Sequence, residues 1–380
     1  MNKEAPIYLD YNATTPIRPE VVDAMLPYLR EHFGNPSSGH VYGARARAAV
    51  NHAREHVGAL LGCDADEMIF TSGGTEANNL AIRGAAEARR ERTHILTSVI
   101  EHPATAQPCA WLESHGRRLT RVGVDADGRV RLDEALGAVS AETALVTVMH
   151  ANNETGVVQP IPELARVGRA CGALIHTDAA QSVGKVRVRV QELGVDLLSL
   201  AGHKVYAPKG VGALYIRRGT PLVPLVLGAG HERGLRPGTE NVASIVGLGL
   251  ACKLAARDLN EESSRMRALR DALWERLAVA IPGLGLNGHR DERLPNTLNV
   301  RFPNVSGGAV LAGAREVAAS TGSACHEGHE QASPVILAMG VSPDKALGSV
   351  RLTLGRGTTD DDVARAAESL ARVWTRLARR

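Results

Sequence analysis

The feature that most constrains the fold is a regular alternation of short apolar runs and helix-forming stretches between residues 67 and 218. Runs such as 94–99, 145–149 and 174–176 are typical of buried strands, and helical sequence separates them. Strands joined through helices in this way build a mostly parallel sheet that is covered on both faces. We therefore predict an α/β fold, in which ligands bind beyond the carboxyl ends of the strands.

The pattern changes near residue 243, where a long helical stretch begins. The segments that follow are a strand at 294–300, a unit at 308–320, a strand at 348–356 and a closing helix at 359–379. This mixture predicts a smaller α+β domain, and 380 residues exceed what one small core needs. We place the large domain at residues 16–255 and the small domain at residues 1–15 and 256–380.

Composition narrows the classes of function. The chain has 44 basic and 41 acidic residues, so its charge gives no argument for a nucleic-acid partner. Five cysteines without a CxxC pair argue against a disulfide framework and fit a cytoplasmic protein. No apolar run reaches the roughly 18 residues of a membrane span, and no leader precedes the first strand, so we expect no membrane segment.

A lysine stands at the mouth of an apolar strand in Ser199-Leu200-Ala201-Gly202-His203-Lys204. Lysine is rarely buried without a purpose. Burial lowers its pKa from about 10.4 towards neutrality, which makes the amine a nucleophile that forms Schiff bases. Taken alone, a surface lysine in a turn explains Lys204 equally well.

Other strand ends carry polar residues that would face the same crevice. TSGGTE (71–76) opens a helix, where free N–H groups and the Thr75 hydroxyl suit an anion, although a plain helix cap also explains it. Asp178 is either a helix cap or the partner of a protonated ring nitrogen, which pyridoxal phosphate (PLP) needs. His102 can stack on a planar cofactor, and Asn153 adds polar donors. Together they favour a PLP site over a dinucleotide site.

These motifs resemble those of the class V aminotransferase-like PLP enzymes, specifically the cysteine desulfurases of the NifS/IscS type, and also the related selenocysteine lyases. The resembling segments are YLDYNATTP (8–16), GNPSS (34–38), FTSGGTEANN (70–79), EHPA (101–104), ANNETG (151–156), HTDAAQSVGK (176–185), GHKVYAPKGVGALYIRR (202–218), HERGLRPGTEN (231–241), RLPNTLNV (293–300), STGSAC (320–325) and VRLTLGR (350–356). The resemblance implies the aspartate aminotransferase-like fold, fold type I.

The resemblance also implies roles around the cofactor. It makes Lys204 the residue that forms the Schiff base with PLP. It pairs Asp178 with the pyridine nitrogen and places Gln181 at the ring hydroxyl oxygen. It stacks His102 on the ring as a catalytic residue. The residues implied to hold the phosphate are Gly74, Thr75, His203 and Thr239.

Further roles concern the substrate and the sulfur. The resemblance implies that Asn12, Asn153 and Arg351 bind the substrate, and an arginine fork matches a carboxylate. Cys325 matches the nucleophilic cysteine that takes the sulfur as a persulfide. Thr239 reaches the phosphate of the partner subunit in this family, which implies a homodimer. The implied reaction converts L-cysteine to L-alanine and passes the sulfur to an acceptor protein, such as an iron–sulfur scaffold or a sulfur carrier.

The sequence departs from the family pattern at two places. Ala201 stands where several relatives have a serine that helps to bind phosphate. After Cys325 the chain continues HEGHE (326–330), where NifS-type loops have small residues and selenocysteine lyases have a histidine. The alternatives are therefore a selenocysteine lyase, or another PLP-dependent carbon–sulfur lyase or aminotransferase. Cys325, His326 and His329 lack a fourth zinc ligand, so we expect no metal site.

Overall fold

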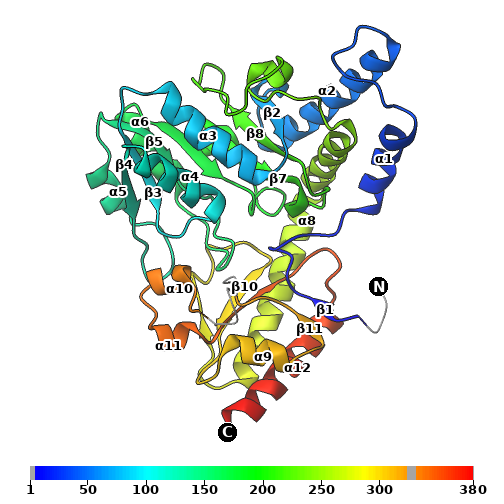
Figure 1. Ribbon diagram of the computed structural model, residues 1–380. Coiled ribbons are helices and arrows are strands. Elements are labelled where there is room, and N and C mark those ends of the chain that lie inside the picture. The colour runs from blue at the N-terminus through cyan, green and yellow to red at the C-terminus, as the bar shows by residue number, and fades with distance from the viewer. Residues whose placement is uncertain (1–4, 323–330, 380) are drawn as a thin grey trace.

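The computed structural model describes residues 5–322 and 331–379, and its upper part in Figure 1 is built on a seven-stranded sheet. In order across the sheet, the strands are β2 (Met68–Thr71), β8 (Gly212–Ile216), β7 (Leu197–Ala201), β6 (Leu174–Asp178), β5 (Thr143–Thr147), β3 (His94–Ser98) and β4 (Arg118–Val122). Neighbours from β7 to β4 are parallel, whereas β8 runs antiparallel to both β2 and β7. The predicted α/β fold with a mostly parallel sheet is confirmed.

Helices cover both faces of this sheet (Figure 1). They are α1 (Pro19–Arg30), α2 (Val41–Leu61), α3 (Gly74–Ala88), α4 (Pro103–Ser114), α5 (Leu132–Ala138), α6 (Ile161–Ala170) and α7 (Val190–Leu193). Successive side chains of a strand point to opposite faces. Leu174 of β6 lies in the apolar cluster that contains α3 and α4, whereas Ile175 lies in the cluster that contains α2 and α6. Because both faces are buried, the strands are continuous apolar runs.

The lower part in Figure 1 has two small sheets, in the orders β12-β10-β9 and β1-β11. Its elements are β1 (Ile7–Tyr8), β9 (Gly285–Leu286), β10 (Thr297–Arg301), α9 (Gly307–Gly313), β11 (Val317–Ala318), α10 (Pro334–Ala338), α11 (Pro343–Ala346), β12 (Ser349–Thr353) and α12 (Asp360–Ala378). β10 begins later than predicted, because Pro295 has no N–H for a ladder and Leu294 donates its N–H to the Gly156 carbonyl at 2.8 Å.

The two parts are joined by α8 (Val242–Ala280), a helix of 39 residues. Leu248 in its first half belongs to the upper core, and Leu273 in its second half belongs to the lower core. The division proposed at residue 255 falls inside this helix. Ile336 of α10, beyond that division, packs with the upper core, and the domain limits stay a prediction. Among the described residues no helix, α8 included, has the length and apolar character needed to cross a membrane.

Candidate active site

A cavity of about 300 Å³ lies beyond the carboxyl ends of the parallel strands. The residues in its wall that the resemblance assigned to the cofactor are Gly74, Thr75, His102, Asp178, Gln181 and His203. Lys204 and Asn153 also line it. The wall thus collects residues from the start of α3, the start of α4 and the ends of β6 and β7, as expected for ligands of a parallel sheet. We call this space the front cavity.

Lys204 ends a short 3₁₀ turn (Gly202–Lys204) that directly follows β7. Its Nζ donates hydrogen bonds to the backbone carbonyls of Asn12 at 2.5 Å and Ala13 at 2.8 Å. Burial lowers the pKa of this amine to about 8, and Arg351 acts in the same direction, while Asp178 opposes the shift. A neutral amine is therefore accessible near neutral pH, which suits a nucleophile and a proton acceptor.

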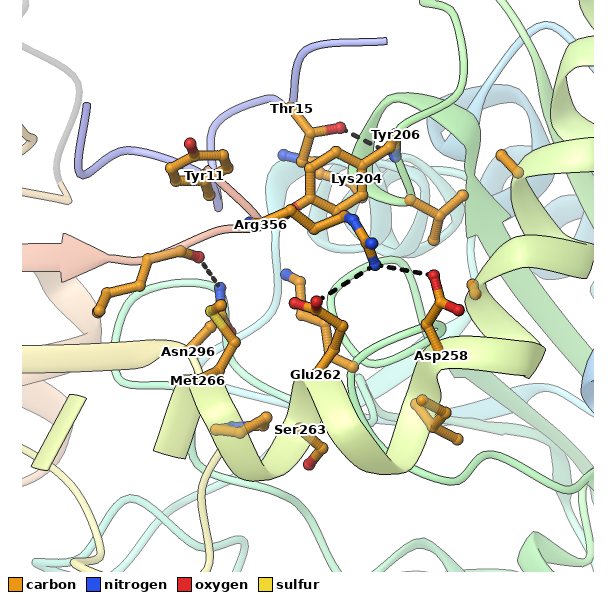
Figure 2. A pocket seen from close by; sticks show the side chains of 18 of the residues that line it. Tyr11, Thr15, Lys204, Tyr206, Asp258, Glu262, Ser263, Met266, Asn296 and Arg356 are labelled. Atoms are coloured by element: carbon orange, nitrogen blue, oxygen red, sulfur yellow. Dashed lines mark hydrogen bonds and ion pairs between the residues drawn. The ribbon is translucent and has the colours of Figure 1, made fainter. Parts of the chain in front are cut away.

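Lys204 also borders a second cavity of about 50 Å³, on the α8 side (Figure 2). We call it the rear cavity. Asp258 of α8 accepts hydrogen bonds there from Arg18 and Arg356, each at 3.0 Å. Arg356 also lies 3.5 Å from a carboxylate oxygen of Glu262. These four side chains therefore form ion pairs with one another beside the rear cavity.

The Asp178 carboxylate is buried at the end of β6 and is held by two donors. Asn78 donates its amide N–H to Oδ2 at 2.7 Å, and the backbone N–H of Ala180 donates to Oδ1 at 2.9 Å. Sequence reasoning missed Asn78. The signal was its spacing: Asn78 follows Thr75 by three residues on one helix, so both face the same side. The Oδ1 atom of Asn78 is buried and has no hydrogen-bond partner among the described residues.

The start of α3 forms an anion site in the wall. None of the described side chains caps this helix, and its first residues, Gly74 and Thr75, line the front cavity, so their N–H groups are available to an anion there. Gly73, the residue before it, has φ of +153°, which a side chain would disfavour. Burial, with Lys204 nearby, lowers the pKa of His203 to about 4, so its imidazole is neutral. Its Nδ1 lies 3.1 Å from the hydroxyl oxygen of Thr14.

His102 and Gln181 occupy other parts of the wall. His102 precedes α4 as its cap, and its Nδ1 accepts a hydrogen bond from the Ala104 N–H at 3.1 Å. Its ring is exposed at the cavity instead of being packed in the core, so one face is available to a planar group. The amide of Gln181 donates to the backbone carbonyl of Asn12 at 3.0 Å, the same oxygen that receives the Lys204 amine.

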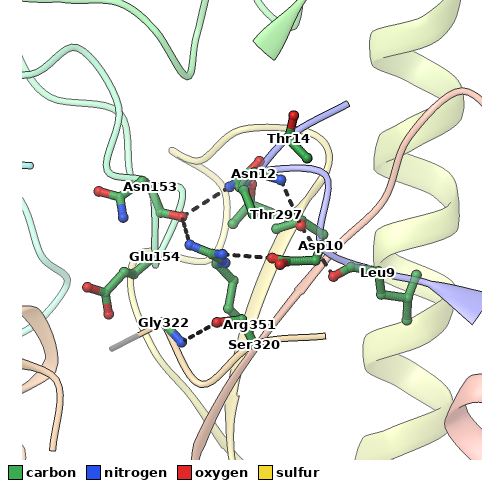
Figure 3. Close-up of polar contacts among 12 residues, drawn as sticks. Leu9, Asp10, Asn12, Thr14, Asn153, Glu154, Thr297, Ser320, Gly322 and Arg351 are labelled. Atoms are coloured by element: carbon green, nitrogen blue, oxygen red, sulfur yellow. Dashed lines mark hydrogen bonds and ion pairs between the residues drawn. The ribbon is translucent and has the colours of Figure 1, made fainter. Parts of the chain in front are cut away.

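Arg351, Asn153 and Asn12 meet beside the front cavity (Figure 3). Arg351 of β12 is buried and donates to the Asn153 carbonyl at 3.2 Å. It also pairs with Asp10 at 2.7 Å, a partner that sequence reasoning missed because the two residues are 341 positions apart. Its Nε atom has no partner among the described residues. The guanidinium therefore keeps a buried donor for a further anion.

The described residues do not place every predicted site residue in the wall of the front cavity. Thr239 is exposed and does not line the front cavity of this subunit. Cys325 lies outside the described residues, together with His326 and His329, so the structure does not test their roles. Arg351 and Asn12 do not line the front cavity either. Asn12 is connected to the cavity wall by hydrogen bonds with Asn153, Gln181 and Lys204.

Lys185 is a second lysine at the site, and no role was assigned to it from the sequence. It is the last residue of the HTDAAQSVGK motif, so its place in that motif could have pointed to a role at the site. Its Nζ donates to the side-chain oxygens of Gln181 at 3.0 Å and Asn12 at 3.1 Å. Burial, together with Lys204 and Arg351, holds the pKa of Lys185 well below its ordinary value.

Comparison with known proteins places these observations in a family. The model of the family described as aminotransferase class-V matches residues 7–366. The chain is 46% identical over 374 residues to "Cysteine desulfurase IscS" of Dictyoglomus turgidum, covering 98% of this chain and 95% of that relative. A solved structure of a "NifS-like protein" superposes with a TM-score of 0.91 at 35% identity, covering 97% of this chain and 99% of that one. A structure described as "SspA in complex with cysteine" has a TM-score of 0.82 at 37% identity, covering 91% and 98%. These matches confirm the resemblance.

Proposed function

This chain belongs to the aminotransferase class-V family, and on that premise we infer that it is a PLP-dependent cysteine desulfurase. It converts L-cysteine to L-alanine and transfers the sulfur to an acceptor. The observation that carries this function is the placement of Lys204. An amine whose pKa is about 8 stands at one cavity with a buried carboxylate, Asp178, and the uncapped start of α3.

The residues of the front cavity fit PLP. The start of α3 and the neutral imidazole of His203 suit its phosphate, with Gly74 and Thr75 at the helix end. Asp178, held by Asn78, suits the ring nitrogen. The Oδ1 atom of Asn78 is a buried acceptor in the cavity wall that has no hydrogen-bond partner among the described residues. When bound, PLP supplies an electron sink for the substrate α-carbon.

Arg351 and Lys204 have different roles: Arg351 binds the substrate, and Lys204 transfers its proton. Arg351, with Asn12 and Asn153, receives the substrate carboxylate, for which its buried Nε is the open donor. Lys204 takes the α-proton at its Nζ and returns a proton to the product. A pKa near 8 favours both steps at neutral pH, because catalysis by proton transfer is most efficient when the pKa lies near the working pH.

Cys325, outside the described residues, is proposed as the sulfur acceptor within the enzyme. Its thiolate attacks the substrate sulfur, the carbon–sulfur bond breaks with its electron pair on the carbon, and a persulfide remains on Cys325. Protonation of that carbon then yields L-alanine. The resemblance supports this role, as does the family of the curated relative.

The assembly is also proposed. Thr239 is exposed, and in the family this position reaches the phosphate of a partner subunit, which supports a homodimer. We propose a cytoplasmic enzyme whose sulfur goes to an acceptor protein such as an iron–sulfur scaffold. Sedimentation of the loaded enzyme tests the dimer, and a monomer with full activity would contradict the role of Thr239.

Replacement of Lys204 tests the central claim. Lys204→Ala should lose the visible absorption band of bound PLP and all release of alanine from L-cysteine, because the only amine proposed to hold the cofactor is removed. The measurement is an absorbance spectrum followed by an alanine assay. Lys253→Ala, at an exposed position on α8, is the matched control and should behave as the wild type. Turnover by Lys204→Ala would reject the proposed function.

Replacement of Cys325 separates the desulfurase from its alternatives. Cys325→Ala should keep bound PLP but stop the release of sulfide from L-cysteine, whereas Cys171→Ala should keep both. A carbon–sulfur lyase or aminotransferase would not need Cys325 and would stay active. The same two variants are then assayed with L-selenocysteine. Alanine formation by Cys325→Ala from L-selenocysteine, but not from L-cysteine, would favour a selenocysteine lyase.

A further inference from the structure

We propose that Lys185 is a positioning residue of this site, which fixes the amide of Gln181 and the side chain of Asn12 so that their donors and acceptors face the cofactor and Lys204. The inference rests on the proposed function. Lys185 does not line the front cavity; it borders the rear cavity, and the side-chain hydrogen bonds that it forms within the described part of the chain go to Gln181 and Asn12.

Lys185 selects one orientation of the Gln181 amide. Its Nζ donates to the Gln181 Oε1 at 3.0 Å, and the Gln181 Nε2 in turn donates to the Asn12 carbonyl at 3.0 Å. If the amide turned over, Oε1 would face that carbonyl oxygen and Nε2 would face the lysine donor. Both contacts would then be lost. The second N–H of Gln181 is therefore held towards the front cavity, where a ring oxygen requires a donor.

Asn12 is held in the same way. Its side-chain Oδ1 accepts from Lys185 at 3.1 Å and from Asn296 at 3.1 Å, and its Nδ2 donates to the Asn153 carbonyl at 3.2 Å. Its backbone carbonyl is the acceptor for Lys204 at 2.5 Å. One residue thus connects the two lysines, with its side chain bound to Lys185 and its backbone bound to Lys204.

The surroundings of Lys185 disfavour its charged form. Both of its hydrogen bonds go to amide oxygens, and among the described residues no carboxylate forms an ion pair with it. The charged groups that act on it are Lys204 and Arg351, and both lower its pKa, as burial does. Each of the two amide oxygens accepts one N–H of this amine.

The experiment measures the pH at which the visible absorption band of bound PLP titrates in the holoenzyme. In Lys185→Met the Gln181 amide keeps only its contact with the Asn12 carbonyl, so its donor is held less firmly and would stabilise the negative charge of the ring oxygen less well. The chromophore then holds its proton to higher pH. We expect an upward shift of about one pH unit, the size of one hydrogen bond to a charged group. kcat should fall while KM changes little, because Arg351 still binds the substrate and the Asn12 side chain keeps its hydrogen bonds to Asn296 and Asn153.

Three further variants keep the test decisive. Lys253→Met removes an exposed lysine and should titrate as the wild type. Lys185→Arg keeps a donor, and the rear cavity offers it room, so it should move the transition back towards the wild-type pH. In a Gln181→Leu background, Lys185→Met should add no further shift, because its effect passes through Gln181.

Two results would overturn the proposal. One is a Lys185→Met enzyme whose band titrates at the wild-type pH, or a Lys185→Arg enzyme whose band titrates at the same pH as that of Lys185→Met. The other is a shift that is additive with Gln181→Leu, which would mean that Lys185 acts by charge alone. Failure of the proposed function looks different: the wild type and Lys253→Met would then show no PLP band at all.

Discussion

The two cavities on either side of Lys204 differ in how their polar groups are satisfied. Beside the front cavity, Asn78 Oδ1 and Arg351 Nε are buried without a partner among the described residues, and α3 has no capping side chain. Around the rear cavity, Asp258 is paired with Arg18 and Arg356. Arg356 also lies near Glu262, as Figure 2 shows. Unpaired buried groups cost free energy, so they persist where a ligand pairs them. The front cavity is therefore suited to bind a ligand, whereas the ion pairs around the rear cavity stabilise the fold.

The largest expected effect is at Lys204, which lines both cavities. Its pKa is about 8 in the folded protein against an ordinary 10.5, so between these pH values the unfolded chain binds more protons. The cofactor-free wild type should therefore gain stability as pH rises from 8 to 10.5. Lys204→Met should be the more stable protein below pH 8, by up to about 3 kcal/mol, with the difference vanishing towards pH 10.5.

Urea unfolding of both cofactor-free proteins at several pH values between 7 and 10 measures this difference. A gap that stays constant with pH would show that the amine titrates at its ordinary pKa. It would also remove the argument that the front cavity activates Lys204.

The next effect is at the front cavity. Asp178→Asn keeps the shape of the side chain but replaces the carboxylate that is proposed to pair with the ring nitrogen. Loss of one hydrogen bond between charged groups is worth about 1.5–3 kcal/mol, so kcat/KM should fall about 10- to 100-fold. The thermal midpoint of the cofactor-free protein serves as the control, and unchanged activity would refute the role of Asp178.

The smallest effect is at the rear cavity. Arg18→Met removes one partner of Asp258, which keeps Arg356 at 3.0 Å and Arg257 at 2.6 Å. We expect a loss of about 1–2 kcal/mol in the free energy of unfolding, since the carboxylate is not left unpaired. The PLP band and its pH titration should not change. A variant that loses PLP but keeps its stability would reverse the assignment of the two cavities.

Local sequence was sufficient to predict the position of a strand where its buried residues form a continuous apolar run. The strands predicted at 94–99, 145–149 and 174–176 lie close to β3, β5 and β6, because both faces of that sheet are buried. β6 is longer than predicted, since it continues beyond His176 through Thr177 to Asp178. His176 is buried there because its ring nitrogens meet the hydroxyl groups of Thr147 at 2.7 Å and Ser199 at 3.0 Å. Such partners come from neighbouring strands, so no pattern within β6 predicts them.

The candidate site was predictable in part for the same reason. Lys204, Asp178 and His102 each follow a strand, and the ends of parallel strands meet at one edge. Asn78, Asp10 and Lys185 were missed, because each acts through a partner that is distant in the sequence. Asp10 meets Arg351 across 341 positions, and Asn78 meets Asp178 across 100.

The sequence by itself determined the parallel sheet, the family and the residues that end its strands, because these depend on local periodicity and on motifs. Only the tertiary structure decided which polar groups are paired. It placed the first residues of the chain, including Asn12, between Lys204 and Lys185, and it brought β12 with Arg351 against Asp10. Hydrogen bonds reach about 3 Å, so packing between the two parts of the molecule had to set these positions.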